Sequence, residues 1–106
     1  MKVTIHQEGK ETVIKIAGRL DTNTSREYED ELLGVWKKSD AHMDPIDVCI
    51  DCSDLEYVSS AGLRLFLLMQ KTATAGKGNL RLTGMRKEIR DVFNVTGFNA
   101  IFKIDS

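Results

Sequence analysis

Two adjacent serines, Ser59 and Ser60, are the residues of this chain best placed to carry chemistry. They stand directly before Ala61-Gly62-Leu63, where apolar residues begin to recur at helical spacing. The first N–H groups of a helix lack partners within the helix, and the helix dipole favours negative charge there. A phosphate on either serine would be well held, and its charge of about −1.5 to −2 would change the surface that a partner meets. A serine at this place can also serve only as the helix cap, which is its commonest role.

A hydrolytic role for these serines has little support in the surrounding sequence. Residues 59–62 lack the G-x-S-x-G elbow that exposes a catalytic serine. The two histidines fall elsewhere, His6 in a predicted edge strand and His42 in a predicted loop over residues 39–45. We therefore predict a modification or capping role rather than a catalytic one.

Cys49 and Cys52 form a C-x-x-C pattern, which can indicate redox chemistry or half of a zinc site. The segment 46–52 is typical of a buried strand, however, and side chains three apart in a strand point to opposite faces. Such a pair cannot form a disulfide, and the second Cys pair that zinc would need is absent from the sequence. We expect structural thiols and no metal. The alternative is a small thiol enzyme, which requires at least one exposed thiol of lowered pKa.

A second polar cluster precedes the first helical pattern. It consists of Asp21-Thr22-Asn23-Thr24-Ser25. These side chains can form a contact surface, or they can simply provide caps for the start of a helix.

Hydrophobic patterning predicts the elements that position these motifs. Alternating apolar residues on both sides of a glycine turn predict a hairpin that ends near Ile16. Helical spacing predicts helices over residues 26–38, from Leu63 to the glycines at 76 and 78, and over 86–95 with Gly97 as its stop. Further strands are expected over 46–52, 79–83 and 100–104, the first of them central and parallel. The order β-β-α-β-α-β-α-β predicts an α/β domain with a mixed sheet of four to five strands.

Length and charge narrow the classes of partner. The 106 residues suit a single domain over residues 1–106. The 15 basic and 16 acidic residues give a net charge of −1, which supplies no electrostatic reason to bind nucleic acid or an anionic membrane. No apolar run approaches a membrane span, and the N-terminus lacks the apolar core of a signal peptide. We expect a cytoplasmic protein that binds a protein or a small ligand.

Three segments resemble the STAS domain family, which occurs in sulfate transporters and in bacterial anti-sigma factor antagonists. They follow one another in the family's order and span nearly the whole chain. The segments are Gly18-Arg19-Leu20-Asp21, residues 48–55 leading into Tyr57-Val58-Ser59-Ser60-Ala61-Gly62-Leu63-Arg64, and Arg90-Asp91-Val92-Phe93-Asn94-Val95-Thr96-Gly97-Phe98.

The resemblance implies a fold and a regulatory function. The fold would be a mixed sheet with helices mainly on one side. A stand-alone member would bind an anti-sigma factor that is also a serine kinase, and phosphorylation of Ser60 would abolish that binding until a separate serine phosphatase reversed it. The chain itself would not be an enzyme and would need no cofactor. The residues expected to contact the partner are Asp21, Thr22, Asn23, Ser59, Ser60, Gly62, Leu63 and Arg64.

Two positions depart from the commonest family pattern. Ser59 stands where many antagonists carry Asp, and Ala61 stands where Ser or Thr is frequent. The alternative within the same family is a module that binds a protein or a small anion without being phosphorylated.

Overall fold

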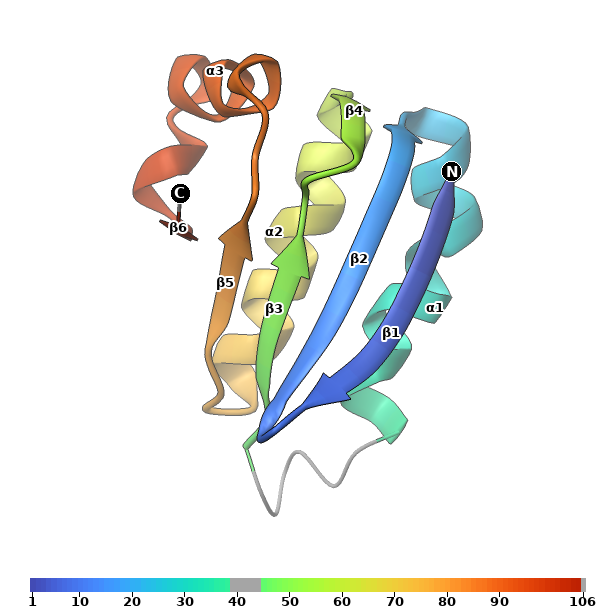
Figure 1. Cartoon of the computed structure of the whole chain (residues 1–106), viewed down its shortest axis with the longest axis vertical. Coiled ribbons are helices and arrows are strands. Elements are labelled where there is room, and N and C mark those ends of the chain that lie inside the picture. The colour runs from blue at the N-terminus through green and yellow to red at the C-terminus, as the bar shows by residue number, and fades with distance from the viewer. Residues whose placement is uncertain (39–44, 106) are drawn as a thin grey trace.

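The computed structural model describes residues 1–38 and 45–105. Of the loop predicted over residues 39–45, only Pro45 is among the described residues, so His42 lies outside them. The described residues form one mixed sheet with helices (Figure 1). The strands are β1 Lys2–Glu8, β2 Glu11–Leu20, β3 Asp47–Asp51, β4 Leu55–Val58, β5 Leu80–Thr83 and β6 Lys103–Asp105. The helices are α1 Thr22–Lys38, α2 Ser60–Ala75 and α3 Lys87–Thr96, with a short 3-10 turn over Phe98–Ala100.

The sheet is opened by a hairpin and continues with parallel strands. Its order is β1-β2-β3-β5-β6, and only β1 and β2 are antiparallel. Glu8 pairs with Glu11 across the turn, where Gly9 has a φ of +62°, a conformation that suits glycine in a two-residue hairpin loop. Strand β3 lies between β2 and β5, parallel to both, which confirms the predicted central position.

The prediction of four to five strands was wrong by one strand, because no strand was predicted over residues 55–58, which form β4. Strand β2 is long enough to have two successive partners. Its first half pairs with β3, and its last three residues pair with β4, with a register shift between Gly18 and Arg19. The four residues of β4 are buried only at their two ends, Leu55 and Val58. This pattern lacks the period-two alternation by which a strand is detected in a sequence.

Both long helices pack on the same side of the sheet, as predicted. Figure 1 looks onto the opposite, uncovered face, with α1 and α2 behind the strands. The core between the layers includes Ile14, Ile50 and Phe66, all fully buried. Phe66 of α2 packs edge-to-face against Phe93 of α3, with ring centroids 5.6 Å apart, and against Phe102 at 6.3 Å. These contacts fix the C-terminal third of the chain to α2.

The last segment departs slightly from the predicted boundaries. The strand expected over residues 100–104 is β6, Lys103–Asp105, because the preceding residues form the 3-10 turn. Gly97 ends α3 in a left-handed conformation with φ +80°, as its position predicted.

Candidate functional site

The two polar motifs lie side by side at one end of the sheet, where β2 and β4 both end. Leu20 and Val58 are paired in register, and the N–H of Ser59 donates to the carbonyl of Leu20 at 2.9 Å. Each strand leads directly into a helix, β2 into α1 and β4 into α2. The starts of both helices therefore lie next to each other at the same end of the sheet, at the top of Figure 1.

Gly62 makes this close approach of α2 to β2 possible. A Cβ atom added at this position would lie 2.7 Å from the carbonyl oxygen of Leu20 and 2.8 Å from a methyl group of Val58. Gly62 is buried, and the following Leu63, 6% exposed, belongs to the hydrophobic core. Both residues were expected to contact a partner, but the structure places them beneath the surface, where they hold the exposed residues in position.

The two serines have different surroundings, and only one caps the helix. Ser59 has extended backbone angles, and its Oγ accepts a hydrogen bond from the N–H of Gly62 at 3.2 Å. Ser60 is the first residue of α2 and is exposed. Within residues 1–38 and 45–105 its hydroxyl forms no hydrogen bond. The capping role left open by the sequence thus falls to Ser59, and the Ser60 hydroxyl is accessible.

Asp21 caps the other helix through a reciprocal pair of hydrogen bonds with Thr24. Asp21 Oδ1 accepts from the Thr24 N–H at 3.0 Å, and Thr24 Oγ1 accepts from the Asp21 N–H at 2.8 Å. The bond from the Thr24 backbone lowers the pKa of Asp21 below its ordinary value, so the carboxylate is ionised. Thr22 and Asn23, in the first turn, are exposed. The cluster therefore provides both a cap and an exposed polar surface.

A pocket of about 220 Å³ lies between α1 and α2 beside these residues. It brings together Arg26 and Glu29, which the sequence analysis did not single out, with Arg64, which it did. Arg64 Nη1 lies 4.0 Å from Glu29 Oε1. Arg26 and Glu29 could have been found from the sequence, because the spacing of residues 22, 26 and 29 places them on one face of the predicted helix. The full lining is Thr22, Ser25, Arg26, Glu29, Ala61 and Arg64.

The family model described as "Mlab, STAS domain" matches residues 3–104. The chain belongs to the STAS domain family. A Bordetella bronchiseptica protein named as an anti-sigma factor antagonist, BtrV, is 30% identical over 104 residues, which cover 98% of this chain and 85% of the relative. The resemblance seen in the sequence is confirmed, and this relative is named as a regulator rather than as an enzyme.

Solved structures confirm the fold of this STAS domain. An anti-sigma-factor antagonist (STAS) domain protein from Planctomyces limnophilus superposes with a TM-score of 0.85 at 19% identity, covering 96% of this chain and 87% of that one. The phosphorylated form of the Bacillus cell fate determinant SpoIIAA gives a TM-score of 0.69 at 16% identity, covering 99% and 92%.

Beside the serine site, Arg19 and Tyr57 form a stacked pair that the sequence analysis missed. The Arg19 guanidinium lies 4.1 Å from the centroid of the Tyr57 ring, which belongs to a residue that is 40% exposed. The two residues are register partners of β2 and β4. The proximity of these two residues could not be predicted without knowing that β4 pairs with β2. Tyr57 places an exposed aromatic ring next to the site.

The cysteines of the STAS domain lack the properties of reactive thiols. Cys49 and Cys52 are free and buried, 3% and 0% exposed. Burial raises the pKa of Cys52 to about 12 and also raises the pKa of Cys49. A thiol enzyme needs the reverse, an accessible thiol of lowered pKa. Across residues 1–38 and 45–105, no cluster of three or more His, Cys, Asp or Glu side chains could hold a metal ion.

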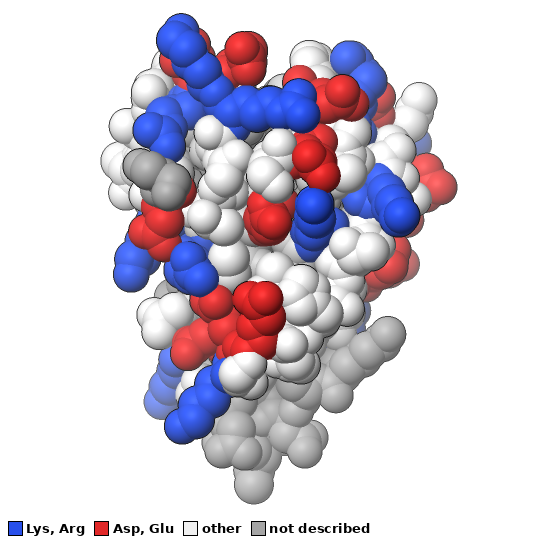
Figure 2. Space-filling view, viewed as in Figure 1, with Lys and Arg blue, Asp and Glu red and all other residues white. Residues whose placement is uncertain are grey.

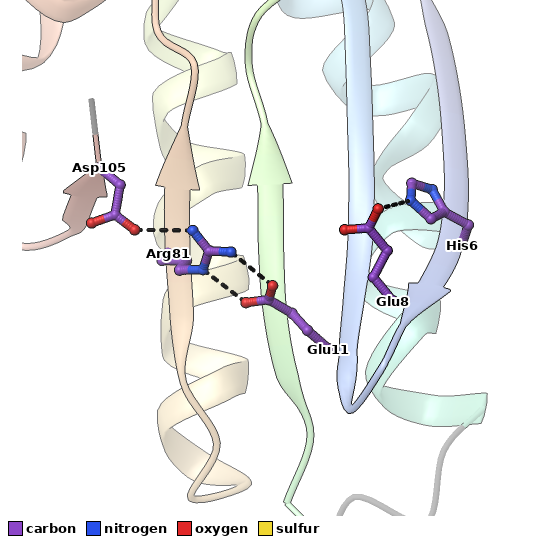
Figure 3. A network of polar contacts seen from close by, with 5 residues as sticks. All are labelled: His6, Glu8, Glu11, Arg81 and Asp105. Atoms are coloured by element: carbon purple, nitrogen blue, oxygen red, sulfur yellow. Dashed lines mark hydrogen bonds and ion pairs between the residues drawn. The ribbon is translucent and has the colours of Figure 1, made fainter.

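Among the described residues, the charged network with the most ion pairs lies on the uncovered face of the sheet, away from the serine site. Arg81 of β5 binds both carboxylate oxygens of Glu11 at 2.8 Å, crossing over β3, and its Nη1 lies 3.0 Å from Asp105 of β6 (Figure 3). The hydrogen bonds from Arg81 lower the pKa of Glu11. This network joins three strands, and its one guanidinium binds two carboxylates, which leaves a net charge of −1.

The rest of that face carries charges of both signs without a dominant one (Figure 2). In the described part of the chain, no helix combines the length and the apolar character needed to cross a bilayer.

Proposed function

We propose that this STAS domain is an anti-sigma factor antagonist that works by partner switching in the bacterial cytoplasm. Its unphosphorylated form binds an anti-sigma factor with serine kinase activity, so that the sigma factor is released. The kinase transfers the γ-phosphoryl group of ATP to Ser60 Oγ, with loss of the hydroxyl proton and departure of ADP. Phosphorylation abolishes binding, and a separate serine phosphatase restores it by hydrolysis.

The observation that carries this proposal is the difference between Ser59 and Ser60. Ser59 is occupied as the cap of α2, whereas the Ser60 hydroxyl is exposed and accessible to a kinase. A phosphate on the first residue of α2 would face the unpaired N–H groups of the first turn. The modified chain should therefore keep its fold while its surface changes.

The size of that change is sufficient for a switch. An interface that buries an uncompensated charge loses roughly 2–5 kcal/mol of affinity, which corresponds to about 30-fold to several thousand-fold in Kd. The surface available to the partner is formed by exposed residues of both helix starts: Thr22, Asn23, Ser60 and Arg64. The name of the relative BtrV, an anti-sigma factor antagonist, supports an anti-sigma factor as the partner.

Phosphate mapping tests the proposal directly. The protein is incubated with ATP and each anti-sigma-type serine kinase encoded in its own genome, and the product is analysed by intact mass and peptide mapping. We expect one phosphate, located on Ser60. The phosphate should be absent from Ser60→Ala and retained in Ser59→Ala, the matched control. A phosphate that persists in Ser60→Ala, or no phosphorylation by any of these kinases, would contradict the proposal.

A further inference from the structure

Arg64 is held in the unmodified protein by a weak contact across the two helices. Its Nη1 lies 4.0 Å from Oε1 of Glu29, and the two side chains are 73% and 39% exposed. Ion pairs this exposed contribute little, because water screens both charges and holding two long side chains costs entropy. Arg64 can therefore exchange Glu29 for a stronger acceptor nearby.

Ser60 is placed to present such an acceptor once it is phosphorylated. Ser60 and Arg64 are four residues apart on α2 and so are surface neighbours, with Cβ atoms about 5–6 Å apart. Long side chains on a helix lean toward its N-terminus. The Arg64 side chain thus leans toward the turn that holds Ser60, and a phosphate oxygen would bring a charge of about −2 within its reach.

The pocket beside Ser60 favours an anion as well. Arg26, on the α1 wall of the pocket, forms no ion pair within the described part of the chain. Ser25, which also lines the pocket, is 6% exposed, and its Oγ has no hydrogen-bond partner among the described residues. A buried hydroxyl without a partner is costly. Two guanidinium groups and an unsatisfied hydroxyl thus surround a space that contains one carboxylate, Glu29.

We propose that phosphorylation of Ser60 transfers Arg64 from Glu29 to the phosphate. This inference rests on the proposed function, since it concerns the same modified serine. The exchange has two consequences at the surface: Arg64 is no longer available to a partner, and Glu29 is left as an uncompensated negative charge. The modified surface becomes more negative around α1 than the phosphate alone would make it, while the arginine compensates the phosphate and preserves the fold.

The second ionisation of the phosphate reports on this contact. Phosphoserine is installed at position 60 during translation, so that no kinase is needed, and the ³¹P chemical shift is titrated with pH. Arg64→Gln should raise the phosphate pKa by about 0.2–0.7 pH units, the range expected for losing one exposed ion pair. Glu29→Gln should lower it, because the competing carboxylate is gone. Lys71→Gln, which removes an exposed cation two helical turns beyond Arg64, is the matched control and should leave it unchanged.

Equal phosphate pKa values in the Arg64→Gln and Lys71→Gln proteins would overturn the inference. So would a rise of the pKa in Glu29→Gln. Circular dichroism of each variant checks that the fold is retained. The result is separable from the proposed function: if phosphoserine at position 60 does not weaken partner binding, that function fails even when the ³¹P titration shows the Arg64 contact.

Discussion

The contact between α2 and β2 predicts that Gly62→Ala gives a less stable protein than the same substitution at a helical glycine with free space around it, although alanine is the better helix former at both positions. The added methyl group would lie 2.7 Å from the carbonyl oxygen of Leu20, which also accepts the N–H of Ser59 at 2.9 Å. The obstacle is backbone, so it cannot rotate away as a side chain would. The helix start or the end of β2 must shift, and overpacking of this kind costs about 1–3 kcal/mol.

Gly34→Ala is the matched control for that substitution. Gly34 lies within α1, and nothing lies within 4 Å of a Cβ added there. Gly34→Ala, in the interior of α1, gains the helix propensity of alanine, about 0.8–1 kcal/mol, and Gly62→Ala, in the first turn of α2, gains at most as much. The difference in unfolding free energy between the two variants therefore isolates the steric cost at Gly62, about 1–3 kcal/mol in favour of Gly34→Ala. This corresponds to roughly 4–20 °C in Tm for a domain of this size.

Urea unfolding followed by circular dichroism measures both free energies under the same conditions. We expect Gly34→Ala to be more stable than the wild type and Gly62→Ala to be less stable than Gly34→Ala by the stated amount. Two variants of equal stability would refute the argument that glycine at position 62 is required by the approach of α2 to Leu20.

Three further predictions concern the cap, the charged network and the thiols. Ser59→Ala should lose about 0.5–2 kcal/mol of stability and Ser60→Ala less than about 0.5, and equal losses in urea unfolding would show that the cap is misassigned. The pKa of Glu11 is lower in the folded chain than its ordinary 4.5, so ionised Glu11 stabilises the fold at neutral pH, and this contribution is lost as the pH falls through 4.5 and then through the folded pKa. Stability should fall more steeply in this acidic range for the wild type than for Glu11→Gln, and parallel curves would exclude the effect. Cys49 and Cys52 should react with a thiol reagent only slowly until urea is added; rapid labelling of either in the native protein would contradict their burial.

The parts of the site that local sequence determines were predictable. Helical spacing after residue 60 and the polar residues before it located the start of α2. Two serines in succession left open which one caps the helix, because either has the required hydroxyl. Only the backbone geometry, with the Gly62 N–H directed at Ser59 Oγ, assigns that role.

The parts that depend on distant pairing were not predictable. Strand β4 exists because it pairs with the end of β2, which lies far earlier in the chain, and its own four residues show no alternation. The stacking of Arg19 on Tyr57 depends on that pairing. The contact between Arg64 and Glu29 similarly depends on the packing of α1 against α2, which spacing along a single helix cannot specify.

The central claim is that the exposed Ser60 controls partner binding. Its most direct test compares the affinity of the anti-sigma factor for the unmodified protein and for the protein carrying phosphoserine at position 60, measured by calorimetry. We predict that phosphorylation weakens binding at least about 30-fold while leaving the circular dichroism spectrum unchanged. Equal affinities for the two forms would contradict the account.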